Sequence, residues 1–458
     1  MTIYSLIAMK RTLFGTDGIR GELNKEPMIA STILKLGQAA AKVLTKKNKK
    51  HRYKIIIGKD TRASGYIFEY ALTSGLCSMG VDVYQVGPMP TPAVAHLVRS
   101  FAADAAIMIS ASHNPAGDNG IKFFSNDGYK LPDEVEAEIE KHFFENNFEA
   151  AHISVDKIGK AYKIEDARGR YIEFVKASIK NRSLKGFKIV LDCSNGAAYK
   201  VAPLIFQELG ADVIILNNNP DGLNINKNCG SQHPEVIIEA VKKHKADVGI
   251  ALDGDADRVI MVDEKGEIVD GDKLLSIIAV HFKNKNKLDK NTVVTTVMAN
   301  AGFDESMKNH NIQVVRTKVG DRYLLEEMQK NGFTLGGEQS GHVILGKHIS
   351  TGDGTLTALH ILSIMVQTNK QLSKLAACME TYPQILINVP VKKKQPVSQC
   401  KEITKAIQEA EKDFNGRILV RYSGTQDLCR IMVEGKDKKQ ITALANTIKK
   451  AVEKEIGK

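Results

Sequence analysis

Short apolar runs alternate with stretches of helical spacing along most of the chain. The first apolar runs are YKIIIG (53–58), GVDVYQVG (80–87) and AAIMIS (105–110), and a helix-like stretch covers 66–79. Apolar runs of this length suit strands that are buried on both faces. Their alternation with helices predicts α/β units with mostly parallel sheets.

The same succession occurs three times. The second unit has FKIVLDC (187–193), a helix-like run at 200–209, GADVIIL (210–216) and ADVGIALDGDADR (246–258). The third has TVVTTVM (292–298), a helix-like run at 302–309, NIQVVRTKVGD (311–321) and FTLGGEQSGH (333–342). Each unit ends in a polar loop with glycine, at the end of the strands where open α/β sheets bind ligands. We therefore expect three loops of different chemistry to face one cleft.

A shorter region follows the third unit. It contains GRILVRYSGTQDLCRIMVEG (416–435) between helix-like segments, and we interpret the proline-marked stretch 382–396 as the linker that leads into it. The expected fold is three related α/β domains with mixed, mostly parallel sheets plus a smaller α+β C-terminal domain, arranged around a central cleft. The expected domains are 1–165, 166–268, 269–378 and 379–458.

Composition narrows the class of protein. The 458 residues are 43% hydrophobic and 26% charged, which is ordinary for a soluble globular protein. No apolar run reaches the length of a membrane helix, and IYSLIAM (3–9) is too short for a signal-peptide core. The six cysteines form no C-x-x-C pair, so we expect reduced thiols and a cytoplasmic protein without a membrane partner.

The net charge of +11 suggests an anionic partner. Much of the excess lies in KKNKKHRYK (46–54) and in KKK (392–394), and aromatic residues do not alternate with these basic runs in the way that a stacking surface for nucleic acid requires. An anionic small molecule fits this pattern better than nucleic acid.

The loop SASHNP (110–115) exposes a serine at the end of a buried strand. The hydroxyl of Ser112 is a poor nucleophile without a base. Neighbouring strand residues point apart, so His113 is no obvious partner unless the loop changes its direction. A serine that stores a phosphoryl group close to a metal ion would instead be a phosphate donor.

The loop DGDADR (253–258) can aim three carboxylates at one point. Asp253, Asp255 and Asp257 would repel one another unless a cation lies between them, and hard oxygen ligands favour Mg²⁺, Ca²⁺ or Mn²⁺. An EF-hand is excluded, because Arg258 occupies its glycine position and RVIMVDE continues as a strand. A polar turn capped by aspartates is the other interpretation, and we favour a magnesium site.

Three further stretches carry polar chemistry. LGGEQSGH (335–342) places Glu338, Ser340 and His342 at alternate positions, which suits sugar hydroxyls but also an ordinary polar turn. GHVILGKH (341–348) only resembles a Walker A loop, since a histidine replaces the final hydroxyl and VIL reads as strand. FGTDGIRG (14–21) sets Arg20 between glycines, as an anion contact or an ordinary loop.

RYSGTQDLCR (421–430) has the donors that a phosphate requires, namely backbone N–H groups, hydroxyls and guanidinium groups, although simple loop chemistry would also explain it. The donors are Arg421, Ser423, Gly424, Thr425 and Arg430.

Taken in order, FGTDGIRG, SASHNP, DGDADR, GGEQSGH and RYSGT resemble the motifs of the α-D-phosphohexomutase family over nearly the whole chain. The first of these motifs, PDGLNINKNCGSQHPE (220–235) and the glutamine of GEQSGH are similar to the bacterial members that act on glucosamine phosphates. The chain departs from the family in one place, where Gln426 and Asp427 replace the usual glutamate and proline after SGT.

The resemblance implies a role for each motif. Ser112 would be the phosphoserine and would share the Mg²⁺ ion with the three aspartates. Arg20, Lys122 and His342 would lie near the reacting phosphate, the last two as acid or base. The substrate-binding residues would be Arg258, Glu338, Ser340, Arg421, Ser423, Gly424, Thr425 and Arg430, those from 421 onwards gripping the distal phosphate.

The implied reaction interconverts glucosamine 6-phosphate and glucosamine 1-phosphate through a bisphosphate, towards UDP-N-acetylglucosamine and the cell wall. A kinase or a sugar bisphosphate would first phosphorylate the serine. Two alternatives remain: a phosphoglucomutase or phosphomannomutase of the same family, and a non-catalytic basic protein that binds nucleic acid or sugar phosphates. The sequence does not fix the oligomeric state, and a homodimer stays open.

Overall fold

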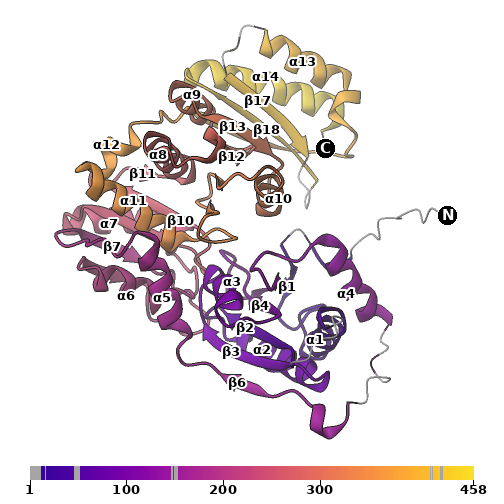
Figure 1. The fold of residues 1–458 in the computed structure, drawn as a ribbon. Helices are drawn as coiled ribbons and strands as arrows, with labels where there is room; N and C mark the ends of the chain where they lie inside the picture. The colour runs from indigo at the N-terminus through magenta and orange to yellow at the C-terminus, as the bar shows by residue number, and fades with distance from the viewer. Residues whose placement is uncertain are drawn as a thin grey trace. The chain divides into compact units, whose positions relative to one another are not determined.

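The computed structural model describes residues 12–15, 17–45, 52–145, 148, 153–412, 414, 416–422 and 427–457. The chain divides into two compact units, Met1–Met298 with Ile312–Ala377, and Ala299–Asn311 with Cys378–Lys458. The first unit contains three sheets and the second contains one, each with helices packed on it (Figure 1). The apolar stretch 3–9 lies outside the described residues.

The first sheet has the strand order β1-β5-β4-β2-β3-β6. Strands β2, β3, β4 and β6 run parallel, and β5 returns antiparallel beside β4. Strand β4 is apolar and fully buried, as expected for a strand with helices on both faces of its sheet. The bounds are β1 (Ile19–Glu22), β2 (Lys54–Lys59), β3 (Asp82–Pro88), β4 (Ala105–Ile109), β5 (Asp118–Ser125) and β6 (Ala161–Lys163).

The second sheet has the order β11-β10-β9-β7-β8, and the third has the order β13-β12-β14-β15. Strand β10 directly follows the aspartate loop, and β15 covers VIL. Both strands were expected from the sequence, and they confirm the arguments against an EF-hand and against a Walker A loop. The bounds are β7 (Lys188–Asp192), β8 (Asp212–Leu216), β9 (Val248–Leu252), β10 (Val259–Asp263), β11 (Ile268–Val269), β12 (Thr292–Thr296), β13 (Gln313–Thr317), β14 (Leu335–Gly337) and β15 (Val343–Leu345).

The three sheets share one strand order, β5-β4-β2-β3 in the first, β10-β9-β7-β8 in the second and β15-β14-β12-β13 in the third. This order confirms the repeated α/β unit and the mixed, mostly parallel sheets. Of the returning strands, β10 and β15 were expected from the sequence, and β5 was not. Because each polar loop therefore connects two hydrogen-bonded antiparallel strands, it is fixed at both ends.

Helices cover the sheets of the first unit. Their bounds are α1 (Ala30–Leu44), α2 (Ser64–Ser78), α3 (Thr91–Ser100), α4 (Asp133–Glu145), α5 (Ala167–Ser178), α6 (Val201–Glu208), α7 (Pro234–His244), α8 (Gly271–Asn284), α10 (Asp321–Asn331), α11 (Gly354–Thr368) and α12 (Leu372–Ala376). None of the helices in the described parts of the chain has the length and apolarity that a membrane span needs.

The second unit consists of the antiparallel sheet β16-β18-β17 and its helices. The stretch 382–396 is not simply a linker, because β16 pairs with β18 along its whole length. The alternating burial of β16 supplies the apolar face for this pairing, and its final proline ends it at the sheet edge. The bounds are β16 (Gln384–Pro390), β17 (Gly416–Tyr422), β18 (Leu428–Gly435), α9 (Ala301–Asn309), α13 (Lys401–Glu411) and α14 (Lys438–Ile456).

A buried histidine on α11 should make the first unit sensitive to acid. The ring of His360 packs beside those of Phe282 and His348, with Nε2 3.2 Å from the Ser178 hydroxyl. Burial, reinforced by His348 and His281, lowers the pKa of His360 to about 3, below its usual value of about 6.5. As the pH falls below about 6.5, the unfolded chain takes up a proton that the folded chain does not.

His360→Gln should therefore lose about 1.4 kcal/mol less stability than the unsubstituted protein between pH 7.5 and 5.5. Urea unfolding at the two pH values measures this difference. An equal loss in both proteins would show that protonation of His360 does not contribute.

Candidate active site

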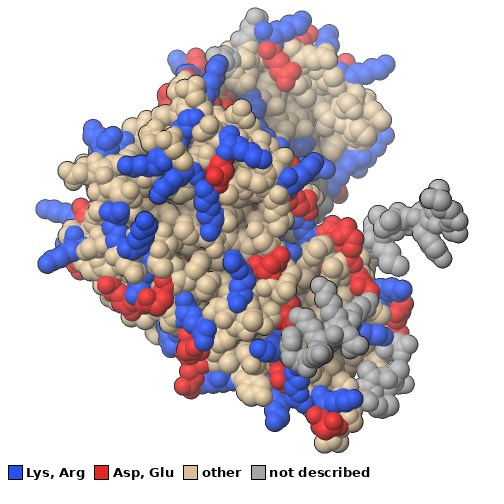
Figure 2. All heavy atoms as spheres, in the orientation of Figure 1, with Lys and Arg blue, Asp and Glu red and all other residues tan. Residues whose placement is uncertain are grey.

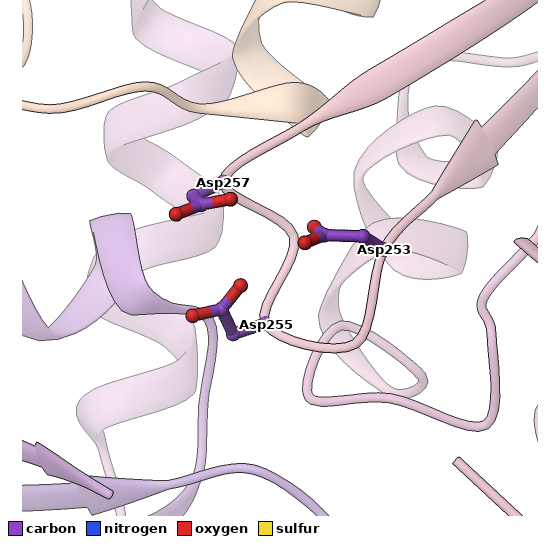
Figure 3. Close-up of side chains that lie close together, drawn as sticks. All are labelled: Asp253, Asp255 and Asp257. Carbon is purple, nitrogen blue, oxygen red and sulfur yellow. The ribbon is translucent and has the colours of Figure 1, made fainter. Parts of the chain in front are cut away.

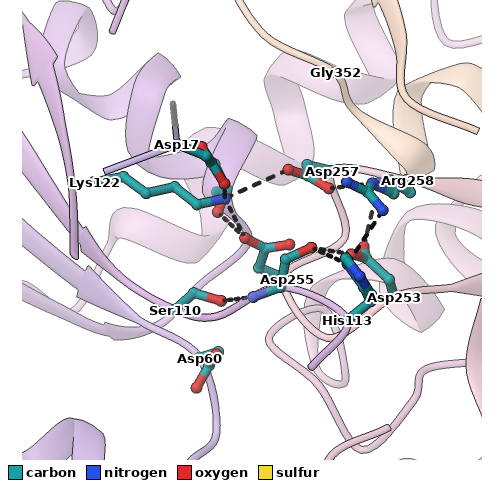
Figure 4. A network of polar contacts seen from close by, with 12 residues as sticks. Asp17, Asp60, Ser110, His113, Lys122, Asp253, Asp255, Asp257, Arg258 and Gly352 are labelled. Carbon is teal, nitrogen blue, oxygen red and sulfur yellow. Dashed lines mark hydrogen bonds and ion pairs between the residues drawn. The ribbon is translucent and has the colours of Figure 1, made fainter. Parts of the chain in front are cut away.

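The three strand-to-strand loops of the first unit bring the polar motifs together, since Ser112 contacts Asp253 and Asp257 lies beside His342. Figure 4 shows side chains from the first two of these loops. One loop connects β4 with β5 and carries SASHNP, the next connects β9 with β10 and carries DGDADR, and the third connects β14 with β15. The three loops occupy the same position in each repeat. This is the arrangement from which we expected them to face one cleft.

Ser112 is buried and has a positive φ of 52°. Its N–H donates to Ser110 Oγ at 2.9 Å, and its hydroxyl donates to Asp253 Oδ2 at 2.6 Å. The left-handed backbone breaks the alternation of the strand, so His113 Nδ1 lies 3.4 Å from the Ser112 hydroxyl. The turn of the loop thus makes His113 a neighbour of Ser112, a possibility that the sequence left open.

The serine loop is held from behind by a buried arginine and an asparagine. Arg62 forms an ion pair with Asp60 and donates to the carbonyl oxygen of Asn114 at 2.6 Å. Asn226 Nδ2 donates to the carbonyl oxygens of Ser112 and Asn114 at 2.9 and 3.0 Å. These contacts fix the position of Ser112 without using its hydroxyl.

The three aspartates of DGDADR converge from one curled loop (Figure 3). One carboxylate oxygen of each lies within 4.8 Å of the others, and all three side chains are buried. Asp255 Oδ1 and Asp257 Oδ1 have no hydrogen-bond partner among the described residues. Buried carboxylate oxygens without donors are the ligand set that a hard divalent cation requires, so this loop fits a metal ion.

The two outer aspartates differ in their electrostatics. Burial raises the pKa of Asp253, and the charges of Asp257 and Asp255 raise it further. Burial also acts on Asp257, but Lys122, His342 and Arg258 overcome it and hold the pKa of that carboxyl below its usual range. The surroundings therefore shift the pKa values of Asp253 and Asp257 in opposite directions, although both are aspartates of one loop.

Lys122, on β5, is the buried cation of the cluster. Its Nζ lies 3.0 Å from Asp255, 3.4 Å from Asp17 and 3.6 Å from Asp257. Burial opposes its charge, but these three carboxylates prevail and raise the pKa of Lys122. Arg20 joins this cluster of charges through an ion pair with Asp17.

Asp17 was missed in the sequence, although it lies inside FGTDGIRG. It pairs with Arg20 and Lys130, and Lys130 also pairs with Asp321. The sequence could have pointed to Asp17, because this residue precedes Gly18 in the same motif as Arg20.

Arg258 and His342 border the aspartates on the other side. Arg258 Nη1 lies 3.1 Å from His113 Nδ1, and its Nε lies 3.8 Å from Asp257. His342 Nε2 accepts a hydrogen bond from the Gly352 N–H at 3.0 Å, so its other nitrogen, Nδ1, faces Asp257 at 3.7 Å. The structure thus places His342 as a neighbour of the Asp257 carboxylate.

A cavity of about 330 Å³ opens beside this cluster and includes Arg258, Glu338 and His342. Glu338 Oε1 accepts from the Gly320 N–H at 3.1 Å, and Ser340 Oγ lies 3.5 Å from Glu338 Oε2. Gly320 and Asp321 line the cavity too and were not singled out in the sequence. They follow the end of β13, so the strand-end rule could have found them.

In the second unit, Arg421 and Arg430 stand directly opposite each other on β17 and β18. Opposed positions place side chains on one face of a sheet, and two like charges there repel. Ser423, Gly424 and Thr425 lie outside the described residues, as does Gln426.

Family models match all four parts of the chain. Their descriptions are phosphoglucomutase/phosphomannomutase α/β/α domain I at residues 11–150, domain II at 169–266, domain III at 270–382 and the C-terminal domain at 386–451.

Similar proteins share much of the sequence. A phosphoglucosamine mutase of Geotalea uraniireducens is 54% identical over 98% of this chain and 99% of its own, and one of Nitratidesulfovibrio vulgaris is 49% identical over 98% and 100%. Among solved structures, a phosphoglucomutase/phosphomannomutase family protein of Burkholderia thailandensis has a TM-score of 0.81 and 22% identity, with 97% of each chain covered.

The Aspergillus fumigatus N-acetylphosphoglucosamine mutase, solved with GlcNAc-6P and magnesium, has a TM-score of 0.65 and 18% identity over 97% of this chain and 96% of its own. At such identities the likeness concerns the fold alone. The family models cover most of the chain, and the full-length relatives are about half identical to it. These two findings show that the chain belongs to the phosphoglucomutase/phosphomannomutase family of phosphohexomutases.

Proposed function

We propose that this protein is a phosphoglucosamine mutase, which interconverts glucosamine 6-phosphate and glucosamine 1-phosphate. The observation that carries the proposal is the buried Ser112 hydroxyl, hydrogen-bonded to the aspartate cluster beside a cavity that suits one sugar. The choice of glucosamine rests on relatives of that name, about half identical over the whole chain.

Ser112 would store the phosphoryl group. In the first half-reaction the phosphoserine gives its phosphoryl group to a sugar hydroxyl, the P–O bond to Ser112 breaks, and a sugar bisphosphate forms. In the second half-reaction the other phosphoryl group of the reoriented bisphosphate returns to the Ser112 oxygen. Arg62 and Asn226 support this step by holding the loop backbone still during both transfers.

Asp253, Asp255 and Asp257 would hold Mg²⁺, with a phosphoserine oxygen completing the ligand set. When bound, the ion would neutralise charge on the transferred phosphoryl group. The buried oxygens of Asp255 and Asp257 that have no hydrogen-bond partner among the described residues support this assignment. Magnesium in the solved Aspergillus relative agrees with it.

The cations around the cluster would stabilise the reacting phosphate. We assign Arg20 and Lys122 to this role, and Lys122 and His342 as the candidates for proton transfer at the sugar hydroxyl. Arg258, Glu338 and Ser340 would orient the sugar from the neighbouring cavity, where Glu338 is fixed by the Gly320 N–H.

Arg421, Ser423, Gly424, Thr425 and Arg430 would grip the phosphate that does not react. The repulsion between the opposed Arg421 and Arg430 supports this role, because a bound phosphate would relieve it. We further propose the domain limits 1–165, 166–268, 269–378 and 379–458.

Ser112 would be primed by a kinase or a sugar bisphosphate. A cytoplasmic location agrees with six cysteines that form no disulfide. The alternative of a nucleic-acid-binding protein gains no support from Figure 2, where the Lys and Arg side chains of the described residues are spread over the visible face among acidic ones.

The substrate decides between the proposed mutase and a phosphoglucomutase or phosphomannomutase. A coupled assay with glucosamine, glucose and mannose 1-phosphates should give the highest kcat/KM for the glucosamine compound. Faster turnover of the glucose or mannose compound would assign the chain to the alternative, and absence of isomerisation with all three would favour a binding protein.

A further inference from the structure

A second cavity, of about 320 Å³, lies where α5 and α8 end beside one face of α11. Helix α11 packs against both of the other helices. The cavity is lined by Lys180 and Arg182 after α5, by Lys285 and Lys287 after α8, and by His281 and His360. We call it the basic pocket; it shares no residue with the cavity beside the aspartates.

The basic pocket gathers cations without counter-charges. No Asp or Glu lines it, and within the described residues its lysines and arginine form no ion pair. Arg182 Nε is buried and has no hydrogen-bond partner among them. Lys180, Lys285 and Lys287 are exposed and Arg182 is half-buried. Charges of one sign that line a single cavity repel each other, so an anion would stabilise this arrangement.

The ends of the helices do not account for this charge. A helix C-terminus attracts cations with a partial charge of about −0.5, so the ends of α5 and α8 supply about −1 against four full positive charges. The positive charges of the pocket act on the neighbouring His281, because burial together with Lys285 and Lys287 lowers the pKa of this histidine. The pocket therefore keeps a net positive potential.

We propose that the basic pocket binds a chain of two or three linked phosphates. Lysine ammonium and arginine guanidinium groups are the usual protein ligands of phosphate oxygens. Four cations match several negative charges better than the charge of one phosphate, and the volume suits a short phosphate chain. Inorganic polyphosphate and the phosphate chain of a nucleotide share this chemistry.

Isothermal titration of the full chain with inorganic tripolyphosphate tests the proposal. Lys285→Gln with Lys287→Gln removes two charges from the pocket, and Lys242→Gln with Lys243→Gln removes two from exposed positions in the last turn of α7. The first pair should weaken binding at least about tenfold and the second less than about twofold. Arg182→Gln provides an independent pocket variant should the double variant fail to fold.

Equal affinity in the pocket and control variants, or no binding to the unsubstituted protein, would overturn the proposal. Orthophosphate should bind at least about tenfold more weakly than tripolyphosphate, and equal binding would also overturn it. Comparison with ATP separates the two sources: tighter ATP binding that is lost in the pocket variants identifies a nucleotide, and weaker ATP binding identifies the inorganic chain.

Discussion

Ser112→Ala should lower phosphoryl transfer by about 10³-fold or more while sugar phosphate binding survives. The substitution removes the oxygen that would carry the phosphoryl group. It leaves Asp253, the aspartate loop and the backbone contacts of Arg62 and Asn226 in place. Turnover and equilibrium binding of glucosamine 6-phosphate, measured on the same preparation, separate the two effects.

Intact-mass measurement should also show a fraction of the unsubstituted protein heavier by one phosphoryl group, located in the SASHNP peptide and absent from the variant. Treatment with phosphatase should abolish the mutase activity, and addition of glucose 1,6-bisphosphate should restore that activity. Ser110→Ala is the matched control. It removes only the acceptor for the Ser112 N–H, a hydrogen bond worth about 1 kcal/mol, so it should cost about fivefold. A dead Ser110→Ala beside an active Ser112→Ala would contradict the assignment.

Asp255→Asn should reduce turnover by about 10³-fold, because it removes one of three carboxylates that would hold the metal ion. Asp255 is buried, and its other oxygen accepts from Thr91 and Lys122, contacts that an asparagine oxygen can keep. The variant should therefore fold. Chelation of divalent ions should have the same effect on the unsubstituted protein.

A thermal shift provides a readout that does not depend on activity. Mg²⁺ should raise the Tm of the unsubstituted protein by relieving repulsion among the aspartates, and it should leave Asp255→Asn nearly unchanged. Asp263→Asn, at the end of β10, is the matched control, since among the described residues its carboxylate accepts only from the N–H groups of Lys265 and Glu267 nearby. It should keep its response to Mg²⁺. Full activity in excess chelator would rule out the metal site.

Much of the fold follows from local patterns. Apolar runs such as that of β4 predict buried strands because they have no polar face to present to water. Their repetition predicts three related sheets, and the shared strand order confirms it. The edge strand β16 was misread, because a short strand that ends in proline resembles a linker until its partner β18 is known.

The candidate site divides in the same way. The sequence by itself determined which residues are chemically suited to phosphate and metal, because carboxylates at alternate positions of a loop carry that information locally. Only the tertiary structure decided how they meet: the turn of His113 towards Ser112, the joining of Asp17 to Lys122, and the support of the serine loop by Asn226. Such contacts join residues as far as 114 positions apart, and no local periodicity encodes them. Asn226 meets Ser112 where two repeats pack together, and Asp17 meets Lys122 within the first repeat, because a buried charge needs a partner nearby.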